Sequence, residues 1–174
     1  ALNNVGPVRK ELGVKTFFNM LGPMVNPAMP KNQLVGVFSL ELARLYGYLY
    51  QNTDKHYVIL HALDGYDEVS LTGNFKMVMN EREEVFSPSD LGLKMVTQEE
   101  IHGGETVPDS AKIFEEILNN KATEAQRDVV LANAGLAIAV GKQIAIEDGI
   151  AQARESLKSG KALESFKHFL SINQ

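Results

Sequence analysis

Three acidic side chains follow one apolar segment within five residues of each other. The stretch His61–Ser70 reads HALDGYDEVS and places Asp64, Asp67 and Glu68 just after the β-branched and aromatic run Tyr57–Leu60. Carboxylate oxygens suit a hard divalent cation, which accepts one or two protein ligands when substrate phosphates supply the rest. Asp and Gly are also common in turns, and acids are usually exposed. Residue types and spacing therefore leave a magnesium site and a solvated loop both open.

A second group of candidate residues lies in VRKELGVKTFFNMLGPMVNP (Val8–Pro27). Arg9 could pair bidentately with a carboxylate or a phosphate, which a lysine cannot do. Gly22 and Pro23 predict a tight turn. Basic residues such as Arg9 are also typical of a solvated surface, so spacing alone does not assign them a ligand.

Composition limits the class of ligand. The 174 residues are 44% hydrophobic and 22% charged, which indicates one globular domain. The formal net charge of −5 gives no basic footprint for nucleic acid, so a phosphate ligand would need local help such as a divalent cation. The chain has no cysteine, no signal-peptide pattern and no apolar run of about 18 residues. These features predict a cytoplasmic protein that uses neither thiols nor a membrane.

Hydrophobic periodicity predicts a strand, a helix and a second strand ahead of the acids. The strands are expected over Gln33–Ser39 and Tyr57–Ala62, with the helix over about Leu40–Gln51. Ser39 can cap that helix. A strand–helix–strand unit favours parallel pairing, so the acids should lie at the carboxyl edge of a sheet, where ligands bind in open α/β folds.

The rest of the chain predicts a hairpin and then helices. The spacing of Leu42, Leu45, Tyr46 and Leu49 predicts the apolar face of the first helix. The fold class is α/β, with a partial central sheet, mixed or parallel, flanking helices and a helical carboxyl-terminal half. The further predicted elements are strands at Phe75–Asn80 and Glu83–Ser87, a short turn at Ser87–Asp90, and helices at about Asp109–Asn119, Glu124–Ala145, Ile146–Ser159 and Ala162–Ile172.

Four stretches together resemble the carboxyl-terminal part of the anthranilate phosphoribosyltransferase family of tryptophan biosynthesis. They are PVRKELGVKTFFNMLGPMVNPA, HALDGYDEVS, SPSDLGL and LANAGLAIAV, which occur in the family's order across essentially the whole chain. The resemblance implies a large domain of the nucleoside phosphorylase and phosphoribosyltransferase class. It also implies a glycosyltransferase that moves phosphoribose from phosphoribosyl diphosphate to anthranilate, releases diphosphate and uses Mg²⁺.

The resemblance implies roles for five residues. Arg9 matches the family arginine that contacts the carboxylate of anthranilate, and Gly22 and Pro23 match the turn that lines the anthranilate channel. Asp67 and Glu68 match the acidic pair that holds magnesium against the diphosphate. No side chain is expected to act as a covalent nucleophile.

Four other positions bear on this assignment. Asn133 matches a family position that we interpret as structural, and we expect His61 to form packing or hydrogen-bonding contacts rather than to act as a base. Lys15 stands where the family usually has Arg, which puts bidentate anion pairing there in doubt. Ala62 stands where it usually has Gly.

Residues 1–174 match only part of the family's length. The family's helical dimerisation domain and glycine-rich phosphate loop have no counterpart here, and HGGE at His102–Glu105 is no substitute. We therefore expect the chain alone to be inactive and its sheet to carry an open edge. The family homodimer is expected only with the missing amino-terminal domain.

Three alternatives share the same fold class. The chain could belong to a related nucleoside phosphorylase, to a nucleic-acid-binding relative, or to a structural module without activity. The net charge of −5 argues against the nucleic-acid-binding relative, and the FFNMLGPMVNP stretch argues against the nucleoside phosphorylase.

Overall fold

The computed structural model describes residues 22–172. The chain divides between Lys31 and Asn32 into two units, which are considered separately. In the first unit the described residues form a 3₁₀ turn, η1 (Gly22–Met24), followed by a turn in which the Met29 amide donates to the Asn26 carbonyl at 3.0 Å.

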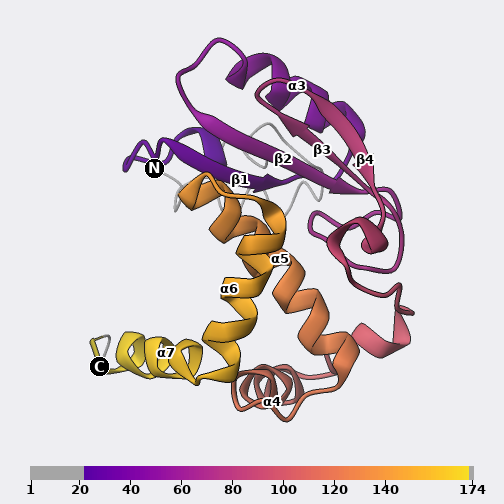
Figure 1. Ribbon diagram of the computed structural model, residues 1–174, viewed down its shortest axis with the longest axis vertical. Coiled ribbons are helices and arrows are strands. Elements are labelled where there is room, and N and C mark those ends of the chain that lie inside the picture. The colour runs from indigo at the N-terminus through magenta and orange to yellow at the C-terminus, as the bar shows by residue number, and fades with distance from the viewer. Residues whose placement is uncertain (1–21, 173–174) are drawn as a thin grey trace, which may run out of the picture. The chain divides into compact units, whose positions relative to one another are not determined.

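The second unit contains a four-stranded mixed sheet (Figure 1). The strands are adjacent in chain order: the first two pair in parallel, and the remaining pairs are antiparallel. This confirms the predicted parallel unit, hairpin and fold class. The strands are β1 (Asn32–Gly36), β2 (His56–Ala62), β3 (Phe75–Met79) and β4 (Glu83–Phe86).

Helix α3 (Leu40–Tyr50) connects β1 to β2. The Ser39 hydroxyl accepts from the Leu42 amide at 3.2 Å, as the capping prediction requires. The predicted apolar face was partly wrong, because Leu45 and Leu49 are 44% and 45% exposed. The helix instead buries Leu42, Ala43, Tyr46 and Tyr50, because the ring of Tyr50 stacks on Tyr57 of β2 with centroids 5.3 Å apart.

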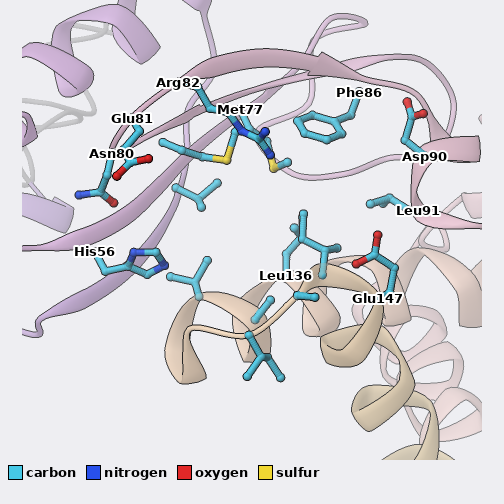
Figure 2. A pocket seen from close by; sticks show the side chains of 17 residues that line it. His56, Met77, Asn80, Glu81, Arg82, Phe86, Asp90, Leu91, Leu136 and Glu147 are labelled. Atoms are coloured by element: carbon cyan, nitrogen blue, oxygen red, sulfur yellow. The ribbon is translucent and has the colours of Figure 1, made fainter.

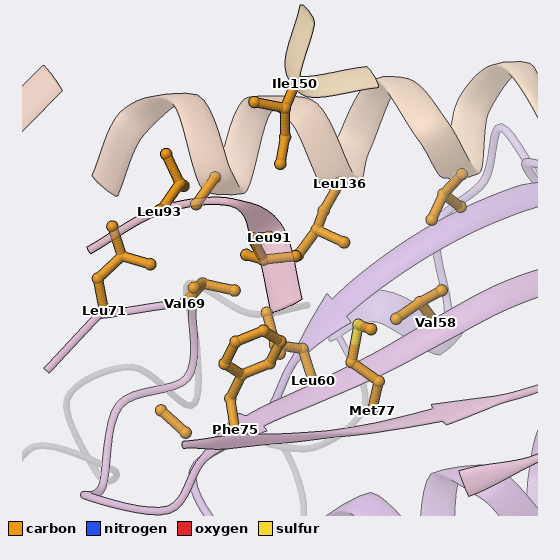
Figure 3. Close-up of a cluster of buried hydrophobic side chains, with 13 residues drawn as sticks. Val58, Leu60, Val69, Leu71, Phe75, Met77, Leu91, Leu93, Leu136 and Ile150 are labelled. Carbon is orange, nitrogen blue, oxygen red and sulfur yellow. The ribbon is translucent and has the colours of Figure 1, made fainter. Parts of the chain in front are cut away.

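Strand β2 is buried on both faces. Its side chains alternate between the two faces, and six of its seven residues are buried. Val58, Leu60 and Ala62 belong to the main hydrophobic core together with Phe75, Met77 and Leu136, and Figure 3 shows this cluster between the strands and a helix. Tyr57, on the alternate face, contacts α3. The sheet is therefore covered by helices on both faces, as in α/β domains.

Helices follow the sheet and build a second, smaller core. Ile117, Leu131, Ala153 and Leu157 come from three different helices and pack together. Capping boxes at Thr106 and Thr123 fix the starts of two of them. The elements after the sheet are η2 (Pro88–Leu91), η3 (Glu99–Ile101), α4 (Val107–Leu118), α5 (Glu124–Lys142), α6 (Ile146–Lys158) and α7 (Lys161–Ile172). Figure 1 labels the four α-helices.

Helices α5 and α6 cross at a contact between two glycines. A Cβ atom on Gly149 would lie 2.2 Å from the carbonyl oxygen of Gly135, and one on Gly135 would lie 2.8 Å from the backbone of Ile150. The two helix backbones therefore touch, which no larger residue would allow. Over residues 22–172 no single helix has the length and hydropathy to cross a bilayer; α5 and α6 pass that test only as a pair bent by 118°.

The close α5–α6 contact predicts that Gly149→Ala destabilises the fold. The added methyl group meets a backbone oxygen, which cannot move aside as a side-chain tip can, so we expect a loss of about 2–3 kcal/mol in the free energy of unfolding. Denaturant unfolding followed by circular dichroism measures this loss.

Gly141→Ala is the matched control on α5. A Cβ atom there meets nothing within 4 Å, so the better helix propensity of Ala should raise stability by about 0.5–1 kcal/mol. Equal effects of the two substitutions would contradict the close helix contact.

Candidate functional site

The acidic stretch forms a tight turn at the carboxyl end of β2. The Gly65 amide donates to the carbonyl of Ala62 at 3.0 Å, and the Ala62 amide donates to the carbonyl of Tyr66 at 3.0 Å. The chain reverses within five residues and then returns toward β3. The acids therefore lie at the edge of the sheet that the sequence predicted.

The three acids differ in their contacts: Asp64 is hydrogen-bonded within its own loop, whereas Asp67 and Glu68 are not. Asp64 accepts a hydrogen bond from the Thr72 hydroxyl and lies 3.4 Å from the Ser70 hydroxyl, and the two hydroxyl oxygens lie 2.8 Å apart. The carboxylate of Asp64 thus ties the turn to the loop that leads into β3. In residues 22–172 no group of three or more His, Asp or Glu side chains is placed to hold a metal, so the three acids do not act together.

Asp67 and Glu68 are exposed and adjacent. Neither side chain makes a hydrogen bond or ion pair with another residue of the described part of the chain. Two neighbouring carboxylates without a partner fit a hard cation, which prefers oxygen ligands and keeps the remaining positions for water or phosphate. The structure thus separates Asp64, which is bonded within its own loop, from the exposed pair Asp67 and Glu68.

The backbone of Asp67 lies directly against the end of β1. A Cβ atom on Gly36 would lie 1.7 Å from the Asp67 carbonyl oxygen, so only glycine permits this approach. Gly36 is not among the residues that the sequence predicted for this site. A glycine at the carboxyl end of a strand was a usable signal, because such residues often mark a close backbone contact.

Asn133 of α5 holds the other side of the acidic pair. Its Oδ1 accepts from the Val69 amide at 2.9 Å, and its Nδ2 donates to the Val69 carbonyl at 2.8 Å. Nδ2 also donates to the carbonyl of Val129, one turn earlier, at 3.0 Å. Asn133 is thus a structural residue, as the sequence predicted. It binds the backbone of Val69, the residue that follows Glu68.

His61 is held in place by a backbone carbonyl. The residue is 7% exposed, and its Nδ1 lies 2.8 Å from the carbonyl oxygen of Val37, so Nδ1 carries the proton and donates it. The bond joins β2 to the segment between β1 and α3. This confirms the expectation that His61 forms hydrogen-bonding contacts.

The remaining predicted residues lie in the first unit. Gly22 is exposed and begins η1, and Pro23 is the second residue of that turn. The predicted tight turn is therefore present. Arg9 and Lys15 lie outside the described residues.

A cavity of about 600 Å³ lies at the opposite end of β2 from the acids. Figure 2 shows it between the β3–β4 hairpin and the corner where α5 meets α6, with Met77, Phe86 and Leu136 forming apolar walls. His56 at its edge is the first residue of β2, about 20 Å along the strand from the acidic turn. Asp67, Glu68 and Asn133 do not line it.

One acid at this cavity is already engaged. The Asp90 carboxylate accepts from the amide and from the hydroxyl of Ser87, each at 2.7 Å, within the capping box of η2. These hydrogen bonds to the ionised form lower the pKa of Asp90. The carboxylate of Asp90 thus stabilises a turn.

Comparison with known families gives one match that covers most of the chain. Residues 1–163 match the model described as "Glycosyl transferase family, a/b domain". An anthranilate phosphoribosyltransferase of Christiangramia forsetii is 60% identical over 174 residues, which are 100% of this chain and 53% of that protein. The chain spans about half the length of the curated relatives it matches.

Solved structures give the same likeness. The anthranilate phosphoribosyltransferase of Saccharomyces cerevisiae in complex with PRPP and Mg has a TM-score of 0.87 and 28% identity, covering 98% of this chain and 49% of that one. The same yeast enzyme in complex with 4-fluoroanthranilate has a TM-score of 0.86 and 27% identity, covering 98% and 51%.

The contact between Gly36 and Asp67 predicts that Gly36→Ala displaces the acidic turn. The methyl group overlaps a backbone oxygen, so the turn must open, and we expect amide exchange over residues 64–69 to accelerate about tenfold or more. Hydrogen–deuterium exchange followed by mass spectrometry measures this.

Gly103→Ala serves as the control, since a Cβ atom there meets nothing within 4 Å. Its exchange over residues 64–69 should match that of the unmodified chain. An unchanged acidic turn in Gly36→Ala would show that this approach does not constrain it.

Proposed function

Because this chain belongs to the glycosyl transferase family, a/b domain, we propose that it is the carboxyl-terminal part of a cytoplasmic anthranilate phosphoribosyltransferase of tryptophan biosynthesis. The longer protein would transfer phosphoribose from phosphoribosyl diphosphate to anthranilate. The observation that carries the proposal is 60% identity to such an enzyme over all 174 residues. The likeness to a solved relative in complex with PRPP and Mg supports it.

Asp67 and Glu68 are the residues that we propose hold Mg²⁺. They are adjacent, exposed and without a hydrogen-bond or ion-pair partner in residues 22–172, whereas Asp64 is occupied by Ser70 and Thr72. When bound, the cation would neutralise charge on the leaving diphosphate. This explains how a chain with a net charge of −5 could accept a strongly anionic substrate.

The reaction requires positioning more than a nucleophilic side chain. The amine nitrogen of anthranilate forms a bond to C1 of the ribose as the bond from C1 to the diphosphate oxygen breaks. The ribose carries oxocarbenium character in between, and the bonding pair leaves with the diphosphate. The amine loses one proton, which we assign to the substrate's own carboxylate. His61 is 7% exposed and its Nδ1 is engaged with Val37, so it is not assigned as the base.

The first unit would supply the contacts to anthranilate. By the resemblance, Arg9 binds the carboxylate through its planar fork of donors, and Gly22 and Pro23 line the channel with backbone. The 3₁₀ turn at Gly22–Met24, which begins at the exposed Gly22, is compatible with that role.

The chain alone would hold half of the active site. We propose that the amino-terminal helical domain and glycine-rich phosphate loop of the longer protein supply the other half, together with the family homodimer. This agrees with coverage of about half of each curated relative. We expect the 174-residue chain alone to show little or no turnover.

The first activity test restores the missing half from the C. forsetii relative. Consumption of anthranilate, followed by its fluorescence with phosphoribosyl diphosphate and Mg²⁺, should appear only in the restored protein. Asp67→Asn combined with Glu68→Gln should lower its rate by about 100-fold or more, because charge on the leaving group is no longer neutralised. Chelation of Mg²⁺ should have the same effect.

The matched control removes two charges elsewhere. Glu115→Gln with Glu116→Gln changes an adjacent acidic pair on α4 and should leave the rate within twofold of the unmodified protein, roughly the range of surface substitutions. Full activity in the Asp67 and Glu68 variant would reject the metal site. A restored protein with no turnover would reject the family activity itself.

A second activity test concerns Arg9. Arg9→Lys keeps the charge but removes the bidentate fork, so KM for anthranilate should rise about tenfold while KM for phosphoribosyl diphosphate changes less. Lys10→Arg is the control. Equal changes in both KM values would place Arg9 away from the anthranilate carboxylate.

A further inference from the structure

The side-chain amide of Asn133 is used almost completely, and in one orientation. Both hydrogens of Nδ2 are donated, to the carbonyls of Val69 and Val129, and Oδ1 accepts from the Val69 amide. A flipped amide would face the Val69 N–H with its own donors and face two carbonyls with its oxygen. The three partners therefore fix the orientation of the amide as well as its position.

The bond to its own helix sets the direction of the Asn133 side chain. Val129 lies four residues earlier in α5, so donation to its carbonyl holds the side chain against the helix surface. The bonds to Val69 span 64 residues of sequence. Asn133 therefore joins helix α5 to the loop that carries the acidic pair, so the position of the helix fixes the position of that loop.

Val69 is held by both its backbone and its side chain. Its side chain is fully buried in the main core, where Figure 3 places it near Leu71, Leu91 and Phe75. Its N–H belongs to the peptide unit that joins it to Glu68. A hydrogen bond to that N–H thus fixes the plane of the peptide that immediately follows Glu68.

The acidic pair lies between two fixed points. On one side the carbonyl of Asp67 lies against Gly36, and on the other the peptide after Glu68 is bound by Asn133. Between these points both carboxylates are exposed and make no hydrogen bond or ion pair in the described part of the chain. A rigid backbone that carries free carboxylates is what a preorganised cation site needs, because less ordering remains to be done on binding.

We infer that Asn133 is a positioning residue for Mg²⁺-diphosphate binding, which orients Asp67 and Glu68 through the backbone of Val69. The inference rests on the proposed function. It assigns to Asn133 an effect on cation affinity in addition to its contribution to stability. Outer-shell residues of this kind typically change metal affinity by about 10- to 100-fold when substituted.

A matched control exists at the other end of β2. Asn80 uses the same pair of groups, accepting from the Tyr57 amide at 3.0 Å and donating to the Lys55 carbonyl at 2.7 Å. It therefore binds backbone in the same manner, about 20 Å from the acids along the strand. Asn→Asp at either position keeps the acceptor and removes the donated bonds.

The test compares Asn133→Asp and Asn80→Asp in the protein with its amino-terminal half restored. In Asn133→Asp the Mg²⁺ concentration for half-maximal rate should rise about tenfold, while kcat at saturating Mg²⁺ falls less. Asn80→Asp should leave that concentration within twofold. Binding of Mn²⁺ in the presence of inorganic diphosphate, measured by the loss of the free-ion electron paramagnetic resonance signal, gives the same comparison without turnover.

Two further variants make each outcome decisive. Asn133→Ala removes all three bonds without adding a charge, so it covers the case in which Asn133→Asp fails to fold. If Mn²⁺ binding is lost in the Asp67 and Glu68 variant but unchanged in the folded Asn133 variants, the inference is wrong and the proposed metal site stands. If the Asp67 and Glu68 variant binds Mn²⁺ normally, both are wrong.

Discussion

The packing of helix α5 against the sheet connects the main parts of the second unit, because the helix buries side chains in two directions. Leu136 and Val140 pack into the core under β2 and β3, whereas Leu131 faces the smaller core that α4 and α6 share. Between them Asn133 binds the backbone of Val69. Burial of a leucine such as Leu136 stabilises the fold by about 1.5–3 kcal/mol. The same helix thus holds the hydrophobic core and the loop that carries the acids.

Charge is distributed in the acidic turn according to hydrogen bonding. Asp64 is satisfied by the hydroxyls of Ser70 and Thr72, so it stabilises the loop and is less available to a ligand. Asp67 and Glu68 have no such partner in the described residues and stay exposed to solvent. Like charges so close together repel one another, and a bound cation would relieve that repulsion. In the proposed function, this would let an acidic protein accept an anionic substrate without a basic surface.

Two close backbone contacts give the second unit its detailed geometry. Gly149 meets Gly135 where α6 crosses α5, and Gly36 meets the carbonyl of Asp67 where β1 ends. In each case the absence of a side chain lets two segments approach to a distance that any Cβ atom would prevent. The first contact sets the angle between helices, and the second sets the height of the acidic turn above the sheet. Both are steric limits and need no favourable interaction of their own.

Sequence periodicity predicted the kinds and approximate limits of the elements, since alternation and helical spacing are local properties. The sequence alone predicts the strand–helix–strand unit, the hairpin, the Ser39 cap and the carboxyl-edge position of Asp67 and Glu68, and the structure contains each of them. The predicted apolar face of α3 was partly wrong, because stacking of Tyr50 on Tyr57 is a contact with another element and leaves no trace in the local spacing. For the same reason only the tertiary structure separated Asp64 from the acidic pair and showed that Gly36 and Asn133 hold that pair. Their partners lie 31 and 64 residues away along the chain, and local spacing carries no information on such contacts.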